Sequence, residues 1–142
     1  MEQQKIPLKK FLPAIAWFFI LSVLVFLPGS DLPKVSWLDK IYFDKIVHAG
    51  LFGGLTLLFC LPFFKSPFSL RQKINYFIRV SLAAIVWGIT VEIIQKYFVP
   101  GRSFDLLDWA ADSAGVLIGF WVCIKILKYL DSANLADSSQ IK

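Results

Sequence analysis

The hydrophobic pattern of the chain consists of four apolar runs separated by polar connections. The runs cover residues 11–27, 46–64, 78–98 and 106–124. Each run is about as long as an α-helix must be to cross the hydrocarbon core of a bilayer, at about 1.5 Å per residue. Pro13 stands in the opening turn of the first run, and Pro100 with Gly101 stops the third. The pattern predicts an all-α fold, a four-helix transmembrane bundle.

Most basic residues of the chain lie in three places. They lie in the N-terminal segment 1–10, in the connection 65–79, which has no acidic residue, and at Lys125 and Lys128. An even number of spans puts all three on one side, and the positive-inside rule assigns that side to the cytoplasm. We therefore expect an N-in, C-in topology in the bacterial cytoplasmic membrane. The expected domains are a basic cytoplasmic N-terminus at 1–10, a membrane domain at 11–128 and a polar cytoplasmic tail at 129–142, disordered from Asp131.

Small residues four positions apart indicate where the helices pack closely. Such spacing occurs in the second run, at Ala49, Gly50, Gly53 and Gly54, and in the fourth, at Ala111, Gly115 and Gly119. Faces of this kind let two membrane helices approach each other. The connection before the second run contains aromatic residues that suit the membrane interface, and its segment 36–42 is expected to form a short surface helix.

Composition supports a membrane protein and excludes some function classes. Of the 142 residues, 57% are hydrophobic and 18% are charged, and the mean hydropathy is +0.65, whereas a typical soluble domain has about a quarter charged residues. The net charge of +5 does not indicate nucleic-acid binding, because Lys and Arg form no basic helix or stripe.

The first run and the two cysteines also have simple interpretations. The run is long for the apolar part of a signal peptide, and no A-x-A cleavage pattern follows it, so we expect a membrane anchor. Cys60 and Cys123 lie inside apolar runs without C-x-x-C spacing. We expect them to pack as small hydrophobic residues and to form no disulfide framework.

Three ionisable residues stand inside the apolar runs. His48, Glu92 and Asp112 each lie about 6 to 9 Å inside the outer end of their run, at about 1.5 Å per residue. A charged side chain that faces lipid at the helix centre costs about 2.5–3.5 kcal/mol, so we expect these three to face one another. Arg102 is the expected counter-charge, because its long side chain reaches down from the outer turn. Lys45 is a second candidate for the counter-charge, but its expected position is the membrane interface.

The polar residues around these three form a set of motifs. They are D-K-x-x-H at Asp44, Lys45 and His48; E-x-x-Q at Glu92 and Gln95; P-G-R at Pro100, Gly101 and Arg102; and D-x-x-D at Asp105 and Asp108, followed by Asp112. Over residues 41–120 the chain resembles the VanZ-like family of small bacterial integral membrane proteins. The resemblance implies four membrane helices and these polar residues, and the family is associated with resistance to the glycopeptide teicoplanin. The family commonly has Asn at the position of Asp112, so this cluster has one more negative charge.

The motifs favour a binding protein of the cell envelope over an enzyme. In this hypothesis the outer polar cluster binds a lipid-linked or cell-wall ligand, or a protein partner, while membrane lipids surround the helices. Arg102 would pair with a phosphate or carboxylate, because its guanidinium offers fixed, bidentate donors. The expected ligand-binding residues are Asp44, Lys45, His48, Glu92, Gln95, Arg102, Asp105, Asp108 and Asp112. We expect no cofactor, no metal and no nucleic-acid partner.

Three alternatives stay open at this point. A membrane-embedded enzyme would use Glu92, His48 and Asp108 in acid–base catalysis, or would use the same groups to hold a divalent metal. Ser103 is the nearest hydroxyl, but no nucleophile motif surrounds it. A channel or transporter would need polar residues along the whole path, whereas here they stop at the outer third. The polar residues could also form a satisfied network that only sets the helix register.

Overall fold

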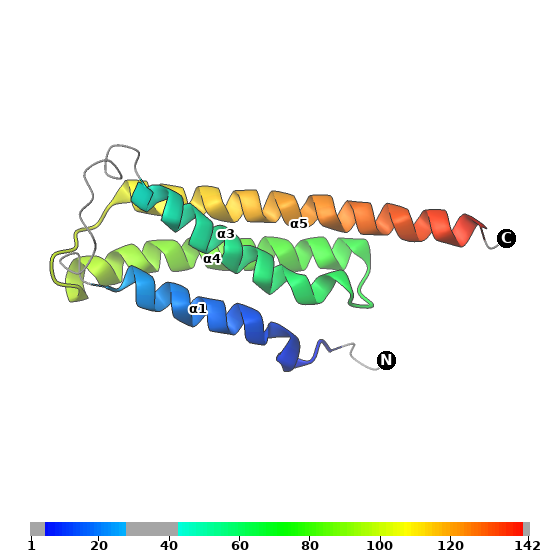
Figure 1. Cartoon of the computed structure of the whole chain (residues 1–142), viewed down its shortest axis with the longest axis horizontal. Coiled ribbons are helices and arrows are strands. Elements are labelled where there is room, and N and C mark those ends of the chain that lie inside the picture. Colours follow the sequence, from blue (N-terminus) through cyan, green and yellow to red (C-terminus); the bar gives the residue numbers. More distant parts are fainter. Residues whose placement is uncertain (1–4, 28–42, 141–142) are drawn as a thin grey trace.

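The computed structural model describes residues 5–27 and 43–140, with side chains as far as residue 133. These ranges are helical and contain no strand. A 3-10 helix, η1 (Leu8–Phe11), leads into α1 (Leu12–Val25), and three longer helices follow, namely α3 (Phe43–Phe64), α4 (Leu70–Phe98) and α5 (Leu106–Gln140) (Figure 1). Within the described ranges, four helices are long and apolar enough to cross a membrane. The predicted all-α fold with four spanning helices is confirmed.

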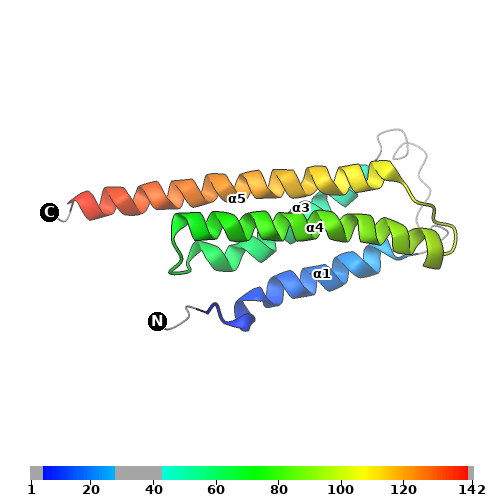
Figure 2. The ribbon, with the colours of Figure 1, turned by 180° about the vertical axis from the view of Figure 1, so that it is seen from behind.

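The helices alternate in direction, so both termini lie at the same end of the bundle (Figure 1 and Figure 2). We name the two ends by their charge. At the acidic end α3 and α5 begin and α4 finishes. At the basic end α3 finishes and α4 begins, and Lys65, Arg71, Lys73 and Arg79 lie there. The helices α3 and α5 therefore run in the same direction, with α4 as the return between them.

The closest helix pair is α3 with α5, because glycines remove the side chains that would separate their backbones. A Cβ added to Gly115 would lie 2.1 Å from the carbonyl oxygen of Ala49, and one added to Gly119 would lie 2.8 Å from that of Gly53. At Gly50, by contrast, an added Cβ would meet no atom of the described residues within 4 Å. The small-residue face of α5 thus packs on Ala49 and Gly53, and this close approach is a source of packing energy in membranes.

The helix α4 begins earlier than its apolar run. It starts at Leu70 rather than at residue 78, because Ser69 and Gln72 form a capping box. The Ser69 hydroxyl accepts from the backbone N–H of Gln72, and the Gln72 side chain accepts from the backbone N–H of Ser69. These contacts satisfy N–H groups that a helix start leaves free. The basic connection is therefore shorter than the sequence predicts.

The helix α5 extends past its apolar run to Gln140, so the expectation of a disordered tail from Asp131 is wrong. The chain has no Gly or Pro after Gly119, and the Ala, Leu and Lys residues in this segment favour a helix. The helix therefore continues through residues 131–140 although this segment is mainly polar. The predicted surface helix at 36–42 lies outside the described residues.

Apolar side chains fill the bundle between its two ends. The buried set nearer the acidic end is Leu21, Val25, Leu51, Phe52, Leu55, Ala84, Val91 and Val116, and the set nearer the basic end is Cys60, Phe63, Phe77, Cys123 and Leu127. Both cysteines are free and buried. Trp17 Nε1 donates to the carbonyl oxygen of Leu51 at 2.9 Å, and Trp109 Nε1 donates to that of Ile85 at 3.2 Å. These indole N–H groups connect α1 to α3 and α5 to α4.

Candidate functional site

Charged side chains from three helices meet at the acidic end in two layers. The surface layer, at the helix ends, consists of Asp44, Lys45, Asp105 and Asp108, and the inner triad, about one turn deeper, consists of His48, Glu92 and Asp112. Each layer contains residues that are far apart in the sequence. The fold therefore collects one polar cluster from three separate motifs.

Lys45 is the cation that holds the surface layer together. Its Nζ lies 2.7 Å from Asp105 Oδ2 and 3.1 Å from Asp44 Oδ2, and it also donates to Asp108 Oδ1. The Lys45 side chain is only 18% exposed. The side chain therefore points into the cluster, whereas the sequence had suggested that it lies in the membrane interface.

Arg102 does not supply the expected counter-charge. Among the described residues it forms no ion pair, and its Nε atom is buried without a hydrogen-bond partner. The register of α3 and α5 explains why Lys45 takes this role. Lys45 stands three residues before His48 on one face of α3, and Asp108 stands four residues before Asp112 on one face of α5. When His48 contacts Asp112, the same register therefore also brings Lys45 next to Asp108.

Asp105 connects the surface layer to the inner triad through its backbone. It lies just before α5, where its N–H donates to Glu92 Oε2 at 2.9 Å and its Oδ1 accepts from the N–H of Leu107 at 2.8 Å. The contact with Leu107 caps the helix, because it satisfies a free N–H of the first turn. The hydrogen bond from Lys45 holds the pKa of the Asp105 carboxyl below its ordinary value.

The inner triad is buried and only partly hydrogen-bonded. His48 is 6% exposed, and both Glu92 and Asp112 are 0% exposed. His48 Nδ1 lies 2.9 Å from Asp112 Oδ1, and one nitrogen or oxygen atom from each of the three residues lies within 4.8 Å of the others. Glu92 Oε1 and Asp112 Oδ2 are buried, and neither has a hydrogen-bond partner within residues 5–27 and 43–133. Since most buried polar atoms have a partner, these two oxygens need an explanation.

Gly88 on α4 makes room for the carboxylate of Asp112. A Cβ added to Gly88 would lie 3.2 Å from Asp112 Oδ2 and 3.4 Å from Trp109 Cδ1. The absence of a side chain lets Asp112 reach between α3 and α4. We did not single out Gly88 from the sequence, although Ala84 four residues earlier forms a small-residue pair with it.

Gln95 lies at the same end of the bundle but serves a different purpose. Its Nε2 donates to the carbonyl oxygen of Val25 at 2.7 Å, and the side chain is 1% exposed. Val25 is the last residue of α1, where carbonyl groups lack partners within the helix. Gln95 therefore caps α1 and does not contribute to the inner triad.

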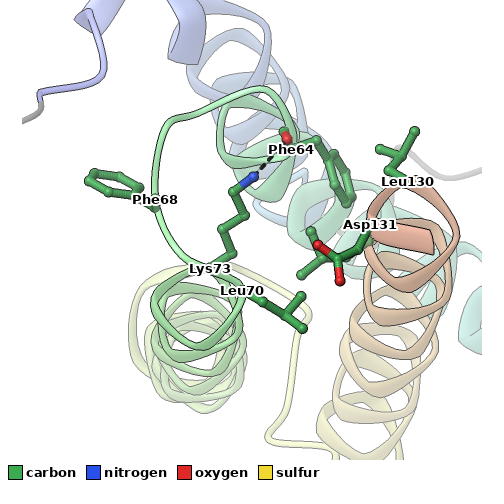
Figure 3. A pocket seen from close by; sticks show the side chains of 7 residues that line it. Phe64, Phe68, Leu70, Lys73, Leu130 and Asp131 are labelled. Atoms are coloured by element: carbon green, nitrogen blue, oxygen red, sulfur yellow. Dashed lines mark hydrogen bonds between the residues drawn. The ribbon is translucent and has the colours of Figure 1, made fainter. Parts of the chain in front are cut away.

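The basic end contains a small cavity of a different character. Phe64, Phe68, Leu70, Lys73, Leu127, Leu130 and Asp131 line about 60 Å³ (Figure 3). Lys73 Nζ donates to the carbonyl oxygen of Phe64 at 3.0 Å, which caps the end of α3. In the described ranges, the only group of three metal-ligating side chains is the inner triad at the opposite end.

A comparison with protein families agrees with the motifs. The family model described as VanZ/LLP1 matches residues 6–128. The match includes α1 and the whole polar cluster, so it extends beyond residues 41–120, where the motifs carry the resemblance. No curated protein and no solved structure matches the chain.

Proposed function

The chain belongs to the VanZ/LLP1 family and is a multi-pass membrane protein, and we propose that its acidic end binds a ligand of the bacterial cell envelope. The ligand is lipid-linked or part of the cell wall, and it carries a phosphate or a carboxylate. The acidic end faces outward, because the basic end carries the loop residues that the positive-inside rule assigns to the cytoplasm.

One observation carries this proposal, namely that the acidic end has more buried polar atoms than the fold uses. Glu92 Oε1, Arg102 Nε and Asp112 Oδ2 all lack hydrogen-bond partners among the described residues. A network that only set the helix register would satisfy its own members, because an unpaired buried polar group costs about 1–3 kcal/mol. Intramembrane ionisable residues more often mark functional sites.

Arg102 supplies the contact to the anionic group of the ligand. Lys45 already pairs with Asp105 and Asp108, so Arg102 is not required to neutralise the surface layer. A guanidinium presents parallel N–H donors that match the oxygens of a phosphate or carboxylate. Arg102 also lies in the turn between α4 and α5, outside the apolar spans, and lipid headgroups are expected at the ends of such spans.

The binding test uses a polyisoprenyl phosphate and the purified chain in nanodiscs of zwitterionic lipid. Arg102→Ala should weaken binding at least about tenfold, because a hydrogen bond to a charged group contributes about 1.5–3 kcal/mol. Arg71→Ala, which removes an exposed arginine at the basic end, is the matched control and should bind like the unmodified chain. Equal affinity of Arg102→Ala and Arg71→Ala would contradict the proposal.

Cysteine labelling tests the orientation. In a background without Cys60 and Cys123, a cysteine at the exposed position Ser103 should react with a membrane-impermeant reagent added to whole cells. A cysteine at Ser69, exposed at the basic end, should react only after the membrane is opened. Labelling of the Ser69 position in intact cells would reverse the assigned orientation.

The inner triad also favours a second candidate function, a membrane-embedded acid–base enzyme acting on an envelope lipid. An imidazole held by a carboxylate at 2.9 Å, with a second carboxylate close by, is a typical arrangement of a general base and the group that orients it. In this case Glu92→Gln should bind a polyisoprenyl diphosphate but fail to release phosphate from it. The enzyme is rejected if the unmodified chain releases no phosphate.

A further inference from the structure

We propose that His48, Glu92 and Asp112 bind one divalent transition-metal ion, with zinc as the first candidate. One potential ligand atom from each residue lies within 4.8 Å of the other two. Ligands that share a zinc ion at about 2.1 Å lie about 3 to 4 Å from one another, so the side chains need to close by about 1 Å.

The unpartnered oxygens are the independent sign of a ligand at this position. Glu92 Oε1 and Asp112 Oδ2 are buried and have no hydrogen-bond partner in the part of the chain that the structure describes, and both residues are 0% exposed. Among the described residues, no Lys or Arg forms an ion pair with Glu92 or Asp112, because Lys45 pairs with the carboxylates of the surface layer. A divalent ion balances two carboxylates and a neutral imidazole completely, which removes the cost of burying these groups in the bundle.

The surroundings hold the three ligands in place. Glu92 Oε2 accepts the backbone N–H of Asp105 at 2.9 Å, which leaves Oε1 for the metal. His48 Nδ1 lies 2.9 Å from Asp112 Oδ1, and a metal bound to both takes the place of the proton that they share. Gly88 keeps the position of Asp112 open. Outer contacts of this kind orient metal ligands and tune their affinity.

The ligand types determine the class of metal. Imidazole nitrogen suits zinc, iron and nickel, whereas carboxylate oxygen suits manganese and magnesium as well. A set of one nitrogen and two carboxylates therefore favours zinc or manganese over calcium. Three protein ligands leave a fourth position of the zinc open, as in catalytic zinc sites.

This inference deepens the proposed function and rests on it for its biological meaning. Two buried carboxylates without a counter-charge would repel an anionic ligand held at Arg102. A metal in the inner triad removes that repulsion and offers its open position to a phosphate oxygen of the ligand. The metal would thus let an acidic cluster receive an anionic lipid.

The experiment is a zinc titration of the purified full-length chain, stripped with a chelator and kept free of lipid ligand. We expect one zinc ion per chain and a rise in melting temperature on binding. Glu92→Gln retains an oxygen for the N–H of Asp105, and Asp112→Asn retains one for His48. Each variant should lower the zinc affinity more than about 100-fold, which exceeds the usual effect of changing an outer contact. Asp131→Asn removes an exposed carboxylate at the basic end and should bind zinc normally.

The absorption spectrum of the cobalt-loaded chain provides a second readout, which does not depend on the folding of any variant. Bands without a thiolate component support ligation by His48 and carboxylates, whereas a thiolate band would place the metal at Cys60 and Cys123 and overturn the proposal. Absence of stoichiometric zinc, or unchanged affinity in Glu92→Gln and Asp112→Asn, would also overturn it. The zinc titration contains no lipid ligand, so a negative result would not decide whether the chain binds polyisoprenyl phosphate. The separate binding assay with Arg102→Ala tests that proposal.

Discussion

The acidic and basic ends of the bundle both contain charged residues, but they use them differently. At the basic end, polar side chains close helix termini near the surface. Lys73 donates to the carbonyl of Phe64, and Ser69 and Gln72 cap the start of α4. The interior beneath them is mainly apolar and includes Cys60, Phe77 and Cys123, with Ser81 as a buried hydroxyl that carries no charge. At this end each described polar contact has an evident role in folding.

The acidic end places ionisable side chains inside the bundle. Asp105 and Gln95 also act as caps there, but Glu92 and Asp112 are fully buried, and each has an oxygen to which no described residue is hydrogen-bonded. Caps at the surface cost little to desolvate, whereas a buried carboxylate costs several kcal/mol unless it is compensated. The capping groups thus stabilise the fold, whereas the buried carboxylates destabilise it unless something compensates them. Functional residues are best sought among the buried groups of this second kind.

The largest expected effect comes from removing the close approach that assembles the acidic end. Gly115→Ala would place a Cβ 2.1 Å from the Ala49 carbonyl oxygen, a backbone atom that cannot rotate away as the end of a side chain could. We expect a loss of at least about 3 kcal/mol, the upper part of the range for overpacking. Thermal unfolding in detergent measures the loss. Gly50→Ala meets nothing within 4 Å and should behave like the unmodified chain; equal stability of the two variants would refute the packing model.

A pair of lysine substitutions compares the two ends directly. Lys45→Met leaves Asp105 and Asp108 without their cation and should cost about 3 kcal/mol, as expected for breaking a largely buried ion pair. Lys73→Met removes only the cap on the Phe64 carbonyl and should cost about 1 kcal/mol. Chemical or thermal unfolding in the same detergent provides both values. Equal losses of stability in Lys45→Met and Lys73→Met would show that the ion pairs of Lys45 contribute no more than the cap formed by Lys73.

Gln95→Leu separates a cap from the ligand site within the acidic end. The substitution removes the hydrogen bond to the Val25 carbonyl and should lower stability by about 1 kcal/mol. Binding of zinc and of polyisoprenyl phosphate should stay unchanged, because Gln95 does not contact the inner triad. A loss of zinc binding in a folded Gln95→Leu protein would show that this distinction is wrong.

The smallest effect is a pH dependence that belongs to Asp105. Because its pKa is lowered by Lys45, its contribution to stability is present above the unfolded pKa, about 3.9 for an aspartate, and is lost as the pH falls through the folded pKa. The unmodified chain should therefore be more stable than Asp105→Asn at neutral pH. The two melting temperatures should converge in acid. A constant difference down to low pH would show that the ionised Asp105 carboxylate does not cause the difference in stability.

Regular helix geometry explains what the sequence predicted about the site. The rise of an α-helix is fixed, so the depths of His48, Glu92 and Asp112 could be calculated from their distance to the ends of the apolar runs. The structure places the three within reach of one another. Their role as ligands remains a prediction, for which the zinc titration is the test.

The partners of the charged residues were harder to predict. Arg102 and Lys45 stand near the same end of the bundle, and both side chains are long enough to reach the cluster. Only the register between α3 and α5 decides between them, and that register depends on the contact of Gly115 with Ala49. The extent of α5 was also missed, because a hydropathy pattern identifies the membrane span but not where a polar helix ends.

The parallel arrangement of α3 and α5 has a consequence for the synthesis of the protein. Lys45, His48 and Glu92 leave the ribosome before any residue of α5, which carries Asp108 and Asp112. Until the last helix inserts, the earlier helices expose polar side chains without their native partners, a state that lipid disfavours. The translocon is therefore expected to release α3, α4 and α5 into the bilayer as one unit, after the final helix has been made.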